Sequence, residues 1–167
     1  MGPAKRCRGK NVPSPQPFQN HLPNAPFLEK MINFNSVSKK ILSQLHTPVS
    51  SVTPDVGPDG IPDYTALFVT LAWQCASTWR KTDYSGGCNG AQIRFPPQTN
   101  TTLFPNNEGM LDIISVLQVI KSTLPLLVKR ISISDMIVLA GQVALKNAGS
   151  PNIHHCGLPL LEAAVMR

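Results

Sequence analysis

Long apolar runs are absent from this sequence. A membrane-spanning helix needs about 18 or more consecutive apolar residues, and each apolar run here is shorter. The basic residues near the N-terminus are also not followed by the apolar core of a secretory signal. These two absences predict a protein without membrane contact that stays inside the cell, with the cytoplasm as the simplest location.

Charged residues are scarce and unevenly placed. They make up 14% of the chain, and the formal net charge is +6. Four positive charges lie within the first ten residues, where there is no acid: Lys5, Arg6, Arg8 and Lys10. The rest of the chain is therefore close to neutral. Since a nucleic-acid groove requires clustered basic residues along a folded surface, we expect no nucleic-acid partner.

Cysteine is sparse, and no two cysteines form a Cys-x-x-Cys pair. The four are Cys7, Cys75, Cys88 and Cys156. Cys75 falls on the apolar stripe of an expected helix, where buried free cysteine is common. The pattern predicts reduced thiols in an intracellular protein rather than a disulfide framework.

Histidines are also few, and only two of them lie near another metal-ligating side chain. His154 and His155 precede Cys156, but adjacent residues point apart and rarely close one tetrahedral site. We therefore expect an exposed turn there and no metal site. His21 and His46 stand alone at the edges of expected elements, where a solvent-exposed histidine is the usual case.

The sequence divides into three parts. Residues 1–26 contain six prolines, which fix φ and remove backbone donors, so this basic segment is expected to be an irregular linker or tail. Residues 27–153 carry helical periodicity and are numerous enough for one domain with a core. Residues 154–167 form a separate final segment.

Three helices are expected outside the centre of the chain, at 36–45, 108–124 and 132–147. The second has a wide apolar face that consists of Met110, Ile113, Ile114, Leu117, Val119, Ile120 and Leu124. The third opens with Ser132 and Asp135, the spacing of a capping box, and is apolar nearly all round. The predicted fold class is all-α, and the third helix is expected to be buried.

The stretch from Thr65 to Gln98 combines a helix with a glycine-rich turn that leads into an extended segment. A loop rich in proline and glycine precedes it at 48–62, and Asp63 stands where an N-cap is needed. Apolar residues recur along the helix at three-and-four spacing: Leu67, Phe68, Leu71, Ala72, Cys75 and Trp79. A second stripe, polar, is formed by Thr70, Gln74 and Ser77. Such a stripe is either a solvated face or one wall of a pocket, and spacing alone favours the solvated face.

Two spaced patterns carry a family resemblance. The first is Ala72-Trp73, Ala76-Ser77-Thr78, Arg80, Asp83, Gly86-Gly87, Asn89-Gly90-Ala91, Ile93-Arg94 and Pro97-Gln98, and the second is Ser134-Asp135, Val138-Leu139-Ala140-Gly141, Val143-Ala144, Lys146 and Ala148-Gly149. They resemble the haem peroxidases of the catalase-peroxidase type, and more narrowly the second, C-terminal domain of those tandem enzymes. The resemblance implies a partial haem-peroxidase fold that contains the helices of the N-terminal lobe only.

The resemblance also assigns a vestigial distal pocket. In the haem-bearing domain of this family an Arg lies four residues before a His, on the helix face above the iron, and a Trp directly precedes the His. The matching positions here are Thr70, Gln74 and Trp73. The His would relay a proton of hydrogen peroxide, and the Arg would stabilise the developing charge. Gln74 has no titratable group to do so. Asn107 matches the asparagine that orients the distal His, and without that His we expect it to cap the next helix.

The resemblance therefore implies a degenerate, non-catalytic domain that supports a catalytic peroxidase domain. We expect no catalytic residue, no bound haem and no metal ion in this chain. The expected binding partner is a catalytic peroxidase domain or a second copy of this chain. The segment 154–167 departs from the family and supplies no proximal histidine at the matching place. The alternative is a haem-dependent peroxidase that reduces hydrogen peroxide in the oxidative-stress response, with its axial ligand from another chain. A third possibility is an interaction module, since half a domain exposes apolar faces.

Overall fold

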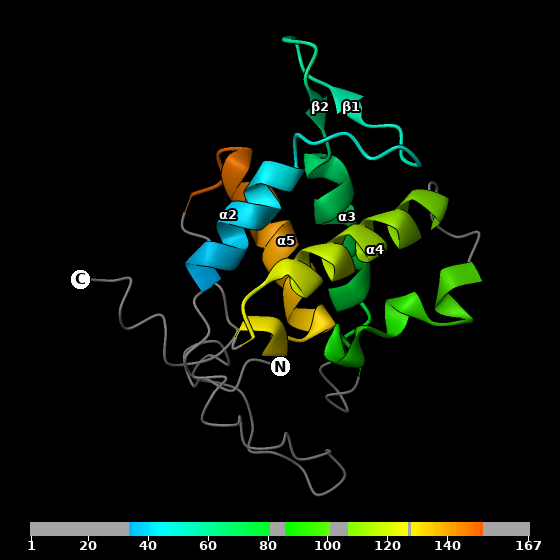
Figure 1. The fold of residues 1–167 in the computed structure, drawn as a ribbon. Coiled ribbons are helices and arrows are strands. Elements are labelled where there is room, and N and C mark those ends of the chain that lie inside the picture. The colour runs from blue at the N-terminus through cyan, green and yellow to red at the C-terminus, as the bar shows by residue number, and fades with distance from the viewer. Residues whose placement is uncertain (1–33, 81–85, 101–106, 127, 152–167) are drawn as a thin grey trace, which may run out of the picture.

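The computed structural model describes residues 34–80, 86–100, 107–126 and 128–151. Its helices are α2 (Phe34–Gln44), α3 (Thr65–Ala76), α4 (Asn107–Thr123) and α5 (Ile133–Asn147), and its short 3₁₀ helices are η2 (Asn89–Arg94), η3 (Gln98–Asn100) and η4 (Val128–Arg130). One hairpin, β1 (Asp55–Val56) and β2 (Pro62–Asp63), projects from the end of the helical body (Figure 1). The expectation of a helical fold is confirmed. The expected linker 1–26 and final segment 154–167 lie outside the described residues.

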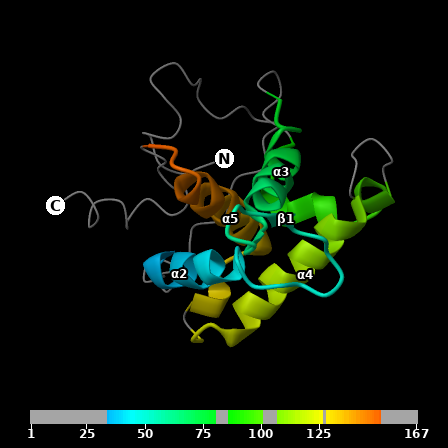
Figure 2. The same cartoon turned by 90° about the horizontal axis from the view of Figure 1, so that it is seen from above.

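Helix α5 lies between α2 and α3 and also contacts α4 (Figure 2). Six of its residues are buried: Met136, Ile137, Leu139, Ala140, Gly141 and Ala144. At its start, the Ser132 hydroxyl accepts a hydrogen bond from the Asp135 backbone N–H at 3.0 Å and donates one to the Asp135 carboxylate at 2.7 Å. The predicted buried helix with a side-chain cap is therefore confirmed.

Helices α3 and α5 approach each other closely. Gly141 of α5 lies against Ala72 of α3, and a Cβ atom added at Gly141 would overlap the Ala72 Cβ. Small residues on both sides let the two backbones come together. This contact fixes the position of α3, on which the sequence places the family's distal residues.

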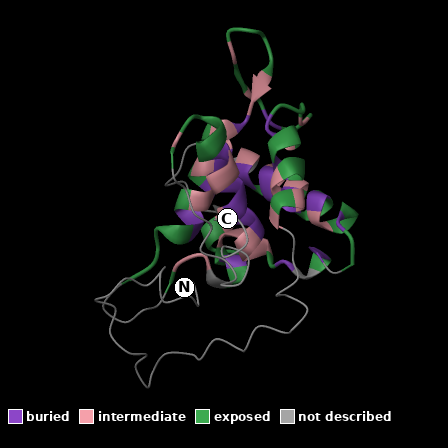
Figure 3. Cartoon of the chain, turned by 90° about the vertical axis from the view of Figure 1, so that its left-hand side faces the viewer, coloured by how far each residue is buried: buried purple, intermediate pink, exposed green. Residues whose placement is uncertain are grey.

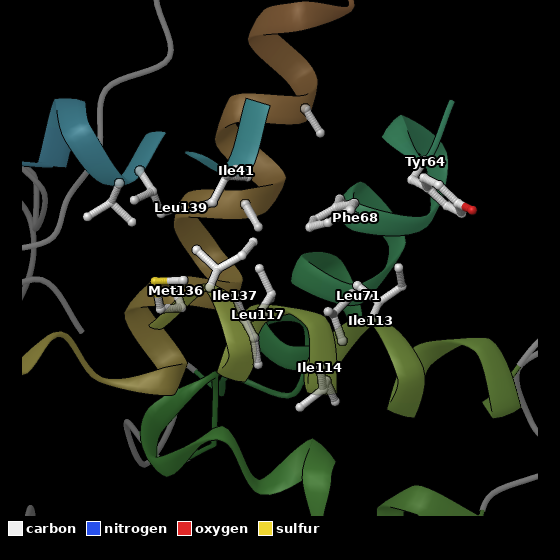
Figure 4. Packing of buried hydrophobic residues seen from close by; sticks show 14 of the residues in the cluster. Ile41, Tyr64, Phe68, Leu71, Ile113, Ile114, Leu117, Met136, Ile137 and Leu139 are labelled. Atoms are coloured by element: carbon white, nitrogen blue, oxygen red, sulfur yellow. The ribbon is translucent and has the colours of Figure 1, made fainter. Parts of the chain in front are cut away.

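The hydrophobic core is shared by all four α-helices (Figure 4). Its fully buried members include Ile41, Phe68, Leu71, Ile113, Leu117 and Ile137. The apolar face expected on α4 is narrower than predicted, because Val119 is 63% exposed while Met110, Ile113, Ile114, Leu117 and Ile120 are buried. Figure 3 shows the buried residues gathered on the inner sides of the helices, while the two strands of the hairpin are intermediate or exposed.

Tyr64 fastens the loop between α2 and α3 to the core. Its ring is 1% exposed, and its hydroxyl accepts a hydrogen bond from the Val49 backbone N–H at 2.9 Å and donates to the Val52 carbonyl at 3.2 Å. The loop expected at 48–62 also contains the short hairpin, in which Asp55 pairs with Asp63. A buried aromatic ring thus orders a segment whose composition indicates only a loop.

The N-cap of α3 is Tyr64, one residue after the predicted Asp63. Asp63 still receives the backbone N–H of Thr65 at 2.8 Å on Oδ1. The hydroxyl and the backbone N–H of Thr65 lower the pKa of Asp63 from 3.8, with a smaller coulombic contribution from His46. Of these two Thr65 groups only the N–H has hydrogen-bond geometry, since the hydroxyl has no partner within the described residues. Asp63 therefore supports the start of α3 from one position outside it.

Among the described helices, none has the length and apolar character needed to span a bilayer.

Candidate functional site

The segment after α3 is a compact turn. Residues 86–95, called here the turn 86–95, hold η2 rather than the extended segment predicted after the glycines, and only Phe95 takes up an extended conformation. Two successive residues of η2 have positive φ, Gly90 at 71° and Ala91 at 49°. Ala91 is nevertheless buried against the core. Left-handed backbone in a non-glycine residue is uncommon, so the packing of its methyl group stabilises the bend.

Thr70, which the resemblance matches to the family's distal Arg, is exposed on α3. Its hydroxyl donates to the carbonyl oxygen of Ala66, one turn earlier, at 2.8 Å. This is the usual back-bonding of a threonine within a helix. The hydroxyl is thus engaged by its own helix and offers no positive charge to a bound peroxide.

Trp73, which keeps the family's residue type, is 68% exposed. Folding usually buries most of the surface of an indole ring, away from water. Nothing within the described part of the chain covers most of this ring. Trp73 therefore lies on a face of α3 that the described residues leave open.

Gln74, which the resemblance matches to the distal His, is buried, with 7% of its surface exposed. The predicted polar stripe is therefore divided, because Thr70 and Ser77 are exposed while Gln74 lies with Leu71 and Cys75 on the core side. Residues four apart on a helix differ by about 40° in direction, which is enough to place one inside the edge of a buried face and the other outside it. The solvated-face interpretation is correct for Thr70 and Ser77 and wrong for Gln74.

Asn107 is the first residue of α4. Its side chain lies outside the described residues, so the expectation that it caps this helix stays a prediction.

The described residues include one histidine, and it lies away from Gln74. The histidine among them, His46, is exposed and holds Nδ1 3.1 Å from the Pro62 carbonyl oxygen, beside the N-terminal end of α3. Gln74 is near the other end of this helix, about 15 Å further along at 1.5 Å per residue. In the part of the chain that is described, no three His, Cys, Asp or Glu side chains are grouped to hold a metal ion. His21, His154, His155 and Cys156 lie outside that part.

Cys75 and Cys88 form a disulfide, with their Cα atoms 4.6 Å apart. The prediction of reduced thiols is wrong for this pair. The two cysteines are 13 positions apart in a sequence that carries no motif for pairing, and the two sulfurs meet only because the chain turns back after α3. Cys7 and Cys156 lie outside the described residues, so the prediction for them is untested.

Two glycines let the turn 86–95 pass close to the end of α3. Gly86 has φ +80°, and a Cβ atom there would overlap the Thr78 carbonyl group. The backbone N–H of Gly87 donates to the Thr78 hydroxyl at 3.0 Å. Glycine is required at Gly86 both by its conformation and by this approach. These glycines bring Cys88 within bonding distance of Cys75.

Comparison with known proteins gives consistent matches. The Peroxidase family model matches residues 50–158. The catalase-peroxidase of Mycobacterium ulcerans is 31% identical over 95% of this chain and 20% of its own length. That of Pseudomonas putida KT2440 is 30% identical over 89% of the chain and 17% of its own length, and that of Aspergillus fumigatus is 29% identical over 96% and 19%. The chain thus spans about a fifth of the length of the curated relatives it matches.

Proposed function

Because the chain belongs to the peroxidase family and has a partial, all-α haem-peroxidase fold, we propose that it is a degenerate domain without catalysis of its own. Its role in this proposal is to support a catalytic peroxidase domain. The observation that carries the proposal is that Gln74 is a buried amide. The resemblance of this chain to the family places the proton-relaying histidine at the same position.

The chemistry at this position argues against turnover. A glutamine side chain donates and accepts hydrogen bonds but cannot take up and return a proton near neutral pH. A positioned general acid or base contributes about 10² to 10⁴ in rate, and loss of an electrostatic donor costs about 10² to 10³ more. With Gln74 and Thr70 in place of the His and the Arg, both contributions are absent.

The exposed ring of Trp73 supports the partner half of the proposal. Burying an aromatic ring of this size is favourable by about 2 kcal/mol or more, and the described residues of this chain leave it open. The chain also spans only about a fifth of its catalase-peroxidase relatives. We therefore propose a catalytic peroxidase domain as the partner, with a second copy of this chain as the alternative occupant of the Trp73 face.

A second candidate function is a haem peroxidase that reduces hydrogen peroxide under oxidative stress. The retained Trp73, together with the family match, favours it. Such an enzyme would need a distal base other than Gln74 and an axial histidine from outside the described residues or from another chain.

Support of a catalytic domain can be measured by adding the purified chain to the separately expressed catalytic domain of the Mycobacterium ulcerans relative. We expect the peroxidase turnover and the thermal midpoint of that domain to rise as this chain is added, and to level off at saturation. The Trp73→Ala variant should raise them less. Thr70→Ala, on the same exposed face, is the matched control and should raise them as the parent chain does. No effect at any ratio, or an equal effect of both variants, would contradict the proposed support through Trp73.

A further inference from the structure

The Cys75–Cys88 disulfide joins the last turn of α3 to the start of the turn 86–95. Cys75 is 4% exposed and belongs to the hydrophobic core. Cys88 is half-buried and precedes η2 as its N-cap residue. One sulfur is therefore anchored inside the protein, and the other is the more accessible to a reagent in solution.

The turn 86–95 packs against α3 and α5 through η2. Its backbone hydrogen bonds include two within the turn, from Ala91 N–H to the Cys88 carbonyl at 3.0 Å and from Phe95 N–H to the Gln92 carbonyl at 2.9 Å. The Gly87 N–H reaches the Thr78 hydroxyl, and the methyl group of Ala91 packs on the core. The disulfide adds a covalent attachment to these contacts, so its state should control how firmly the turn is held.

The surroundings of both sulfurs also suit the reduced form. Cys75 sits among apolar side chains, where a neutral thiol behaves as a small hydrophobic group. Cys88 Sγ lies 3.8 Å from the carbonyl oxygen of Ser134 in α5. A disulfide sulfur has no proton to donate to that oxygen, whereas a thiol does. Reduction therefore leaves neither sulfur in an unfavourable environment.

We propose that Cys75 and Cys88 are a reversible redox modification site that the folded protein accommodates in both states. In oxidation, a hydroperoxide converts one thiolate to a sulfenic acid with release of an alcohol or water. The second thiol then displaces hydroxide, which leaves as water, and the S–S bond forms. In reduction, a dithiol thiolate attacks Cys88 Sγ, Cys75 leaves as a thiolate and takes up a proton, and the second thiol of the reductant releases Cys88 while the reductant becomes a disulfide.

The test uses the full chain with Cys7→Ser and Cys156→Ser, which leaves only this pair. The protein is treated with dithiothreitol without denaturant and then with hydrogen peroxide. At each step, alkylation with peptide mass spectrometry, circular dichroism and a thermal melt are recorded. We expect a Cys75–Cys88 peptide in the oxidised sample, two alkylated thiols after reduction, unchanged helical content, and recovery of the linked peptide with peroxide. The midpoint should fall by about 5 to 10 °C on reduction.

Hydrogen exchange locates the effect. Reduction should increase exchange in the turn 86–95 and leave α4 and α5 protected. A Cys75→Ala/Cys88→Ala variant of the same chain should resemble the reduced form and be indifferent to both reagents. The proposal is overturned if no Cys75–Cys88 peptide is found, if reduction abolishes the helical signal, or if peroxide fails to restore the bond.

Discussion

At the scale of single residues, three neighbours on α3 meet three different environments. Trp73 is open to solvent, Gln74 is buried, and Cys75 is bonded to Cys88. Successive residues on a helix differ by about 100° in direction, so adjacent positions face different surroundings. A change at one of these three positions therefore does not test the others.

Tyr64 offers the clearest stability test at this scale. Tyr64→Phe keeps the buried ring but removes the hydroxyl that accepts from Val49 and donates to Val52. A buried hydrogen-bonding group left without its partner costs about 1 to 3 kcal/mol, and we expect a loss of that size in urea unfolding. Thr70→Ala, which removes an exposed hydroxyl bonded within its own helix, should change stability by about 0.5 kcal/mol or less. Equal effects of the two changes would contradict the anchoring role of Tyr64.

Asp63 gives a pH-dependent test. Thr65 lowers the pKa of this carboxyl group below 3.8, so the folded state binds its proton more weakly than the unfolded state. Its stabilisation is complete above the ordinary value and is lost as pH falls through the lowered value. Thermal melts should therefore show Asp63→Asn to be slightly less stable than the parent at pH 6, and the difference should shrink as pH falls below the ordinary pKa of the carboxyl group. A difference that grows toward low pH would show that the sign is wrong.

At the scale of elements, the contact between α3 and α5 determines how the distal positions are held. The Ala72 side chain lies so close to Gly141 that a methyl group added at residue 141 would overlap it. Helix packing of this kind depends on the smallest residues at the crossing. The position of α3 should accordingly respond to changes in α5 that lie far away in sequence.

A double-mutant cycle tests this crossing. Gly141→Ala improves helix propensity by about 1 kcal/mol but overpacks the crossing, which typically costs about 1 to 3 kcal/mol. We expect a net loss in the parent background. In an Ala72→Gly background the overlapping methyl group is gone, so the same change should be neutral or stabilising. Urea unfolding of the four proteins measures the coupling, and strict additivity would contradict the crossing geometry.

The sequence predicts elements well where one local signal is strong. The Ser132–Asp135 cap and the all-round apolarity of the following residues locate α5, and it is found at Ile133–Asn147. The disulfide could not be predicted, because its two cysteines meet only through the close approach of Gly86 and Gly87 to Thr78. The burial of Gln74 was also missed, since a polar residue at the edge of an apolar face is assigned by periodicity to the solvated side. Both misses depend on contacts between segments rather than on local pattern.

At the scale of the whole molecule, the described residues form a helical core that leaves Trp73 largely exposed. The core is complete enough to bury Phe68, Leu117 and Ile137 fully. Stability and catalysis are therefore separate questions for this protein. The fold accounts for the stability, while the proposal of a supporting domain concerns catalysis.

A hemin titration with a hydrogen peroxide turnover assay on the same sample tests the central claim most directly. The parent chain is compared with Thr70→Arg/Gln74→His, which restores the distal residue types. For the parent we predict no sharp, saturable Soret band and no turnover above free hemin. If the variant gained turnover with added hemin, loss of the distal pair would account for the inactivity. A saturable Soret band with turnover in the parent would contradict the account.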